Sequence, residues 1–191
     1  NWQKLHIIEF NSKLTSIGEA AFQKCSFLST YNDGPALIFK ESLLTIGNYA
    51  FSDLTISSTY YNYPINISFG EKEPNLQVIG SYAFAGSRIG PDIRIPNSVI
   101  EIGAHAFENC SIEKLSISIN IKEIANYTFA GNKIDNITIP HSCVSIGEYA
   151  FYQCSSYYLS MGRNVETIGV SAFQDCGSIM GPLVILNSVK A

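Results

Sequence analysis

Histidines, carboxylates and cysteines are the residues of this chain that could do chemistry. The histidines lie far apart and form no HExxH-type metal motif. They are His6, His105 and His141. Single glutamates recur one or two residues before Ile102, Ile124 and Ile168, at Glu101, Glu123 and Glu166. Acid–base catalysis needs converging groups, such as the two facing carboxylates of a glycoside hydrolase. The sequence shows no such pair, so it predicts a protein that is not an enzyme and that uses no cofactor and no metal.

The five cysteines are an odd number, which excludes complete pairing within one chain, and none forms a C-x-x-C motif. Four of them stand three residues after a phenylalanine: Cys25, Cys110, Cys154 and Cys176. Cys143 occupies an apolar position and is predicted to lie in the core. We expect free, inward-facing thiols. No disulfide is expected between Cys154 and Cys176, because side chains stacked in a ladder point the same way.

Composition limits the class of partner. With 46% apolar and 15% charged residues the chain is globular. Its net charge of −4 argues against nucleic acid, which requires clustered Lys and Arg. No apolar run approaches the roughly 18 residues of a membrane span, so no membrane insertion is expected. The chain begins with Asn1 rather than Met, from which we expect a fragment whose signal or anchor lies outside it.

The sequence contains an internal repeat, which predicts the elements that position these residues. An isoleucine, usually followed by glycine, precedes a phenylalanine by five residues. The isoleucines are Ile17, Ile46, Ile79, Ile102, Ile124, Ile146 and Ile168. Their spacings are 29, 33, 23, 22, 22 and 22 residues. We therefore predict a single domain over residues 1–191, with insertions at about 26–36 and 55–75 and a regular array over about 76–191.

A short run of alternating residues, typical of a β-strand, lies upstream of each pair. The runs are IEF (8–10), LIFK (37–40), ISFG (67–70), IRIP (93–96), LSIS (115–118), ITIP (137–140), LSMG (159–162) and LVIL (183–186). One connection of fixed length recurs, so these strands cannot pair as hairpins. They must stack as a parallel sheet, one strand per coil.

The full pattern is L-x-x-I-x-I-P-x-S-V-x-x-I-G-x-x-A-F-x-x-C, which residues 89–110 and 134–154 meet best. It resembles the BspA-type leucine-rich repeats over essentially the whole chain. The resemblance implies an α/β fold, a right-handed leucine-rich-repeat solenoid of about 22 residues per coil with short helical or irregular return segments. It also implies a secreted or cell-surface protein linked to adhesion and host binding. The chain departs from the pattern in its insertions, in Ala125 where glycine is usual, and in units without Cys.

Two columns of the repeat carry further expectations. The glycine after each isoleucine should have ordinary negative φ and allow two backbones to pass closely, because Ala125 is accepted in this column. The position two before the phenylalanine is mostly aromatic, at Tyr49, Tyr82, His105, Tyr127 and Tyr149. Its rings either cover the seam between coils or form a ledge for contact with a protein or glycan, and we favour the structural interpretation.

Two surfaces are candidates for ligand binding. The outward-facing strand positions include Arg94, Ser116, Thr138 and Ser160. They form either a binding face or an ordinary solvated sheet. The second surface is the insertion that contains Tyr60, Tyr61 and Tyr63, which either binds a ligand or caps the N-terminal end of the stack.

We therefore predict a monomeric, non-enzymatic binding or adhesion module, extracellular or on the cell surface, whose partner is a protein or glycan such as a host ligand. The alternative is a structural spacer domain of a larger surface protein. Binding predicts an exposed aromatic or apolar patch on the strand face or the insertion, whereas a spacer predicts uniformly polar exposed surfaces.

Overall fold

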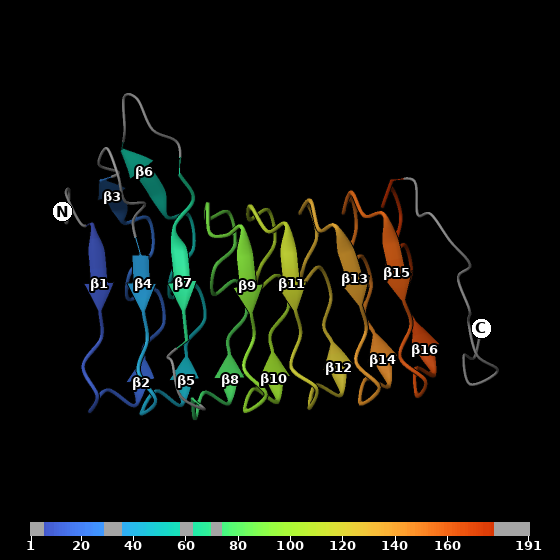
Figure 1. Cartoon of the computed structure of the whole chain (residues 1–191), viewed down its shortest axis with the longest axis horizontal. Helices are drawn as coiled ribbons and strands as arrows, with labels where there is room; N and C mark the ends of the chain where they lie inside the picture. Colours follow the sequence, from blue (N-terminus) through green and yellow to red (C-terminus); the bar gives the residue numbers. More distant parts are fainter. Residues whose placement is uncertain (1–5, 29–35, 58–62, 70–73, 178–191) are drawn as a thin grey trace.

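The chain coils into an elongated rod in which two rows of parallel strands run along the axis (Figure 1). The computed structural model describes residues 6–28, 36–57, 63–69 and 74–177. Each coil passes through a three-residue strand, turns, and then passes through a two-residue strand that ends at the repeated isoleucine. The predicted parallel-strand solenoid is confirmed.

The longer strands form one row, the upper row in Figure 1, which we call the front row. They are β1 (Ile7–Glu9), β4 (Ala36–Ile38), β7 (Asn66–Ser68), β9 (Asp92–Arg94), β11 (Lys114–Ser116), β13 (Asn136–Thr138) and β15 (Tyr158–Ser160). The short strands form the back row: β2 (Ser16–Ile17), β5 (Thr45–Ile46), β8 (Val78–Ile79), β10 (Glu101–Ile102), β12 (Glu123–Ile124), β14 (Ser145–Ile146) and β16 (Thr167–Ile168). The expected strand at 183–186 lies outside the described residues.

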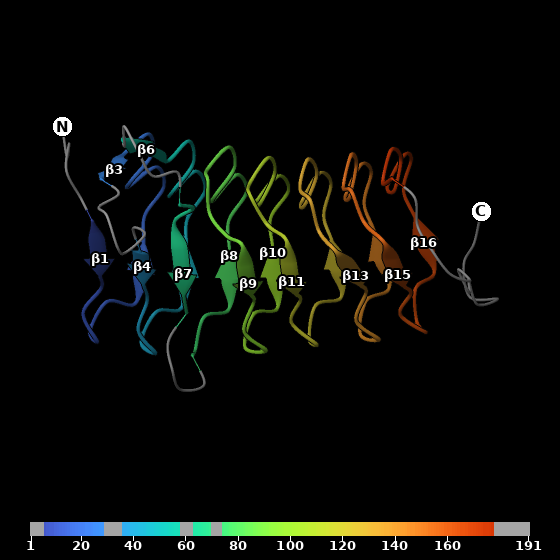
Figure 2. The ribbon, with the colours of Figure 1, turned by 45° about the horizontal axis from the view of Figure 1, so that its top comes forward.

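A third pair of strands occurs only at the N-terminal end. Strand β3 (Ser26–Leu28) pairs in parallel with β6 (Thr55–Ser57), and both lie together at that end of the rod in Figures 1 and 2. These strands stand where the two insertions were predicted to begin. Most of the first insertion and part of the second lie outside the described residues.

Two details of the prediction need correction. Each described coil contributes two or three strands rather than one. The described residues contain no helix, so neither the α/β class nor the helical return segments are confirmed, and the segments after each isoleucine are turns.

Left-handed residues explain why these turns do not become helix. Two columns of the repeat have positive φ. The column two residues before the phenylalanine has φ of 53–60° at Ala20, Tyr49, Tyr82, His105, Tyr127, Tyr149 and Ser171. The second column follows four residues later, with φ of 51–72° at Lys24, Asp53, Gly86, Asn109, Gly131, Gln153 and Asp175. A right-handed helix cannot continue through such residues.

The core is a ladder of identical side chains. Rings of Phe22, Phe51, Phe84, Phe107, Phe129, Phe151 and Phe173 stack coil upon coil, with centroids 5.1–5.6 Å apart. Phe10, Phe39 and Phe69 form a second stack of rings, and each follows directly after one of the first three front strands. The back-row isoleucines are in register, for example Ile46 with Ile79. Each coil therefore covers the apolar surface of the next, which a single coil cannot do alone.

The glycine column behaves as predicted. None of its members is among the positive-φ residues. A Cβ on Gly103 would lie 2.4 Å from the backbone N of Ser81, whereas a Cβ on Gly18 would meet nothing within 4 Å. Because Gly18 belongs to the first coil, the missing Cβ of this column is the one that would strike the backbone of the preceding coil.

Ala125 explains where the back row breaks. In neighbouring coils the glycine amide bonds to the preceding isoleucine: Gly103 N donates to Ile79 O and Gly147 N to Ile124 O, both within 2.8 Å. In the described residues Ala125 N makes no such bond to Ile102 O, and β10 and β12 are not paired. We attribute this break to the alanine Cβ, because in the glycine-bearing coils the backbone of the preceding coil lies where a Cβ would be.

All five cysteines are free thiols. Cys110, Cys143, Cys154 and Cys176 are buried, which confirms their inward placement, while Cys25 in the first coil is only half-buried. Burial raises the pKa of Cys154 to about 12 and that of Cys176 to about 11. These thiols are therefore packing and hydrogen-bonding groups rather than nucleophiles.

Candidate functional site: a groove in the front row of strands

The candidate site begins at a proline. In later coils the residue immediately before each front strand donates its amide to the coil before it. Glu113 N bonds to Pro91 O, and Tyr157 N bonds to Asp135 O, at 2.8 and 3.0 Å. Pro91 holds this position before β9 and has no N–H to donate. An isolated bridge joins Ile65 to Ile89, but β7 and β9 belong to different sheets.

The unpaired strands leave free backbone groups. Where two front strands are paired, the amide that follows one strand donates to the next, as Phe39 N does to Ser68 O at 2.8 Å and Ile95 N to Ser116 O at 2.9 Å. The equivalent bond from Phe69 N to Arg94 O is absent from the described part of the chain. A donor and an acceptor therefore remain available at the break.

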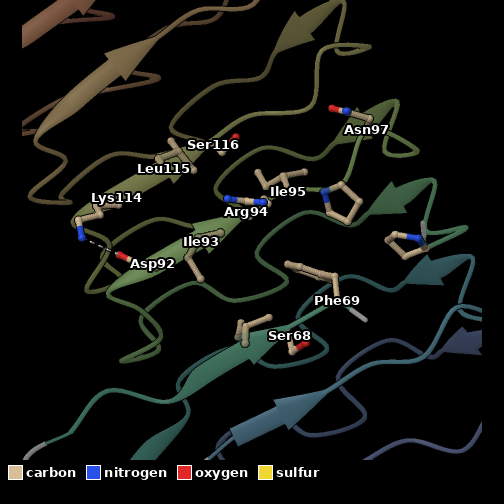
Figure 3. A pocket seen from close by; sticks show the side chains of 13 residues that line it. Ser68, Phe69, Asp92, Ile93, Arg94, Ile95, Asn97, Lys114, Leu115 and Ser116 are labelled. Atoms are coloured by element: carbon tan, nitrogen blue, oxygen red, sulfur yellow. Dashed lines mark ion pairs between the residues drawn. The ribbon is translucent and has the colours of Figure 1, made fainter. Parts of the chain in front are cut away.

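A groove of about 710 Å³ lies at this break, lined by β7, β9, β11 and the residues after β9 (Figure 3). Phe69, Ile93 and Ile95 line it as largely buried apolar side chains. Hydroxyl and amide groups come from Ser68, Ser116 and Asn97. The groove thus combines an apolar base with polar groups along its sides.

Charge within the groove is predominantly positive. The Lys114 ammonium lies 3.8 Å from the Asp92 carboxylate, and both side chains are well exposed, so this ion pair is weak. Arg94 stands between them and Asn97 along the groove (Figure 3). Among the residues described, Arg94 has no ion pair or side-chain hydrogen bond, and it is exposed. Arg94 is therefore a solvent-exposed cation with no ion-pair partner among the described residues, although the whole chain is acidic.

The predicted strand-face residues are divided between the groove and the rest of the face. Arg94 and Ser116 line the groove, and they are register partners across β9 and β11. Thr138 and Ser160 are register partners on β13 and β15, exposed on the same face but outside the groove lining. The alternation of the strands therefore predicted that these four residues share one exposed face, but it did not predict the groove.

The tyrosine insertion is described only in part. Tyr63 is 47% exposed, whereas Tyr60 and Tyr61 lie outside the described residues. Tyr158 at the start of β15 is 57% exposed on the front row, and the adjacent Tyr157 is similarly exposed. The exposed surfaces are thus not uniformly polar.

The aromatic column forms a continuous stack. Ring centroids from Tyr49 through Tyr82, His105 and Tyr127 to Tyr149 are separated by 4.8, 4.3, 4.6 and 4.8 Å. The predicted stacking is confirmed, because successive rings contact one another face to face along the column. Nδ1 of His105 lies 2.8 Å from Oε2 of Glu108, which fixes the histidine within the stack.

The described residues hold no group of three or more His, Cys, Asp or Glu side chains that could bind a metal ion. His105 is paired within the ring stack, and the Nδ1 of His141 accepts the backbone amide of Arg163 at 3.2 Å. The groove can position a ligand through charge, hydroxyl groups and free backbone groups. Asp92 is the one acidic side chain in the described lining, so the described part of the groove contains no pair of carboxylates.

Sequence reasoning missed Asp92, Lys114 and Pro91. The strands begin one residue earlier than the alternating runs suggested, so Asp92 and Lys114 were left outside the strand face. The signal that was available was Pro91, because a proline at the start of a strand removes a ladder hydrogen bond.

Comparison with known proteins decides the family. A family model described as the BspA type leucine rich repeat region, in six copies, matches residues 1–72 and 54–180. The chain belongs to the BspA-type leucine-rich repeat family. No curated protein matches it significantly.

Two solved structures resemble this BspA-type chain. A leucine rich cell surface protein from Faecalibacterium prausnitzii A2-165 aligns with a TM-score of 0.53 at 18% identity, covering 93% of this chain and 58% of that one. The chain thus spans little more than half of that protein, and the likeness supports the fold alone. The pneumococcal vaccine antigen PcpA aligns with a TM-score of 0.35 at 15% identity, covering 96% of this chain and 66% of that one, which is too low to carry an argument.

Among its described residues, the BspA-type chain has no helix that is long and apolar enough to cross a bilayer.

Proposed function

We propose that this BspA-type repeat chain is a non-enzymatic binding module of the cell surface or extracellular space, which attaches to a protein or glycan through its front row. The observation that carries the proposal is the groove at β7 and β9, where an exposed Arg94 without a counter-charge lies beside free backbone groups. Extended surfaces of stacked repeats commonly bind partners in this way.

Exposed aromatic residues favour binding over a spacer role. A spacer needs only polar outer surfaces, yet Tyr63, Tyr157 and Tyr158 are each about half exposed, at 47, 56 and 57%. Large aromatic side chains left in solvent are typical of contact surfaces. The similarity to a protein named as a leucine rich cell surface protein agrees with a surface location.

The proposal is tested with beads coated with the folded chain. Their retention is measured on arrays of extracellular-matrix proteins and glycans and on cultured animal cells. We expect retention above that of uncoated beads and a several-fold loss with Arg94→Gln. Lys133→Gln is the matched control, because Lys133 is exposed and does not line the groove.

Two further outcomes separate the alternatives. If coated beads behave as uncoated beads on every surface, the spacer role is favoured and the proposal fails. If retention survives Arg94→Gln but is lost when Tyr60, Tyr61 and Tyr63 are changed together to Ser, the insertion rather than the groove is the binding surface.

A further inference from the structure

We propose that the groove between β7 and β9 accepts an extended peptide segment of a partner protein that carries an acidic side chain. This inference rests on the proposed binding function and specifies its ligand. The acidic side chain would pair with Arg94, and the peptide backbone would bond to the backbone groups left unpaired between β7 and β9.

The charge argument rests on Arg94. A guanidinium presents a planar set of donors that matches a carboxylate in a two-point hydrogen bond. Lys114 is the nearest other cation of the groove, but it is already near Asp92 at 3.8 Å. Arg94 should therefore dominate recognition of an acidic group, and Lys114 should contribute less.

The backbone argument selects a peptide. The Phe69 amide and the Arg94 carbonyl are the groups that would have paired β7 with β9. Peptides commonly bind by adding backbone hydrogen bonds to an open strand edge, with side-chain pockets that supply specificity. Pro74 and Pro96 line the same groove. Because proline has no N–H, neither residue can donate a backbone hydrogen bond to the peptide.

A glycan is the less favoured occupant. Sugar rings pack on exposed aromatic faces, and the one aromatic residue in the described groove lining, Phe69, is only 6% exposed. The ring faces of the tyrosine stack are occupied by neighbouring rings. The groove therefore offers a cation and a strand edge but no stacking surface.

The experiment is a selection from a phage-displayed library of random peptides on the folded chain, with the Arg94→Gln chain used for counter-selection. Arg94 is exposed, so this variant should keep its fold, which circular dichroism and the unfolding midpoint check. Selected peptides are then synthesised in three forms: unchanged, with Asp or Glu changed to Asn or Gln, and with single backbone N-methyl groups.

We expect enriched peptides to contain an acidic residue and to bind the Arg94→Gln chain about tenfold more weakly, the usual scale for a lost charge-assisted pair. The amide forms of the peptides should lose affinity to the same extent. Lys114→Gln should have a smaller effect and Lys133→Gln none. N-methylation should weaken binding at alternate residues only, because alternate amides of a strand face one edge.

The inference is overturned if no peptide is enriched over the Arg94→Gln chain, or if the enriched peptides lack acidic residues. Equal loss at every N-methylated position would exclude pairing with a strand edge. If the beads adhere to glycans or proteins but the selection fails, only this inference is lost. If the beads adhere to nothing while acidic peptides are selected, the adhesive role fails and the groove assignment stands.

Discussion

The thiol of Cys154 donates a hydrogen bond to the backbone carbonyl oxygen of Phe129, one coil earlier, across 3.1 Å. The same column uses other donors for the same purpose. Ser87 Oγ bonds to Phe51 O at 2.6 Å, and Asn132 Nδ2 bonds to Phe107 O at 2.8 Å. Cys, Ser and Asn each donate to the carbonyl of the phenylalanine in the previous coil, whereas Leu54 in the same column is buried without a side-chain donor.

Replacement of Cys154 should separate this hydrogen bond from packing. Cys154→Ala removes this donor, while Phe129 O keeps its bond from Asn132 Nδ2 at 2.8 Å, so we expect a loss of about 0.5–1.5 kcal/mol in unfolding free energy for the bond. Cys154→Ser keeps a donor and should cost less. Urea unfolding followed by circular dichroism measures both. Equal destabilisation by Ala and Ser would mean that the column selects volume alone.

Alkaline pH should destabilise the fold through its buried thiols. Burial raises the pKa of Cys143 and Cys176 to about 11 and of Cys154 to about 12, from an ordinary value of 9.0. Between these values the unfolded chain loses protons that the folded chain keeps. The contribution of these thiols to the unfolding free energy should therefore be constant below about pH 8 and should fall above pH 9 by about 1.4 kcal/mol per pH unit for each thiol.

This pH dependence is measured by urea unfolding at several pH values in the presence of a reductant. Cys154→Ser removes one titrating group and should make the decline shallower by about 1.4 kcal/mol per pH unit. A decline of unchanged steepness in this variant would assign the alkaline sensitivity to other groups.

Ala125→Gly should restore pairing in the back row. Without the Cβ, the amide of residue 125 can approach Ile102 O as the Gly103 amide approaches Ile79 O at 2.8 Å. We expect hydrogen exchange of this amide to slow by about tenfold, which corresponds to one net hydrogen bond. The reciprocal variant Gly147→Ala should speed exchange of its own amide, since its Cβ would lie 2.7 Å from the backbone N of Asn126. Unchanged exchange in both variants would show that Ala125 is not the cause of the break.

Gln153→Gly should stabilise the chain. Gln153 has φ of 55°, and the same column holds glycine at Gly86 and Gly131. Glycine accepts this conformation without strain, so we expect a gain of about 0.5–1 kcal/mol, whereas Gln153→Ala should be nearly neutral. Thermal and urea unfolding of the two variants make the comparison. A result in which Ala is more stable than Gly would contradict left-handed strain at this position.

The repeat made much of this fold predictable. The stacked phenylalanines, the negative φ of the glycines and the inward thiols follow from one rule, that equal positions in successive coils occupy equal environments. The strand face carrying Arg94 and Ser116 followed from simple alternation. Such columns can be recognised in a sequence because the same type of residue recurs at the same position of several coils.

Features that depend on backbone conformation were harder to predict. Asp53, Asn109 and Asp175 belong to residue types that tolerate positive φ, and their column could have been recognised as left-handed. Tyrosines give no such signal, so the conformation of Tyr49 or Tyr127 was not predictable. The shape of the groove follows from the divergence of two strands rather than from any motif.

The interruptions of the two strand rows have a mechanical consequence. The front row is interrupted between β7 and β9 and between β11 and β13, whereas the back row is interrupted between β10 and β12. The interruptions of the two rows do not coincide. Where two successive coils of the described rod are unpaired in one row, their strands are paired in the other row. Under tension along the axis, two coils would separate first in the row where their strands are unpaired. The rod would therefore bend there while the paired row still holds the coils together.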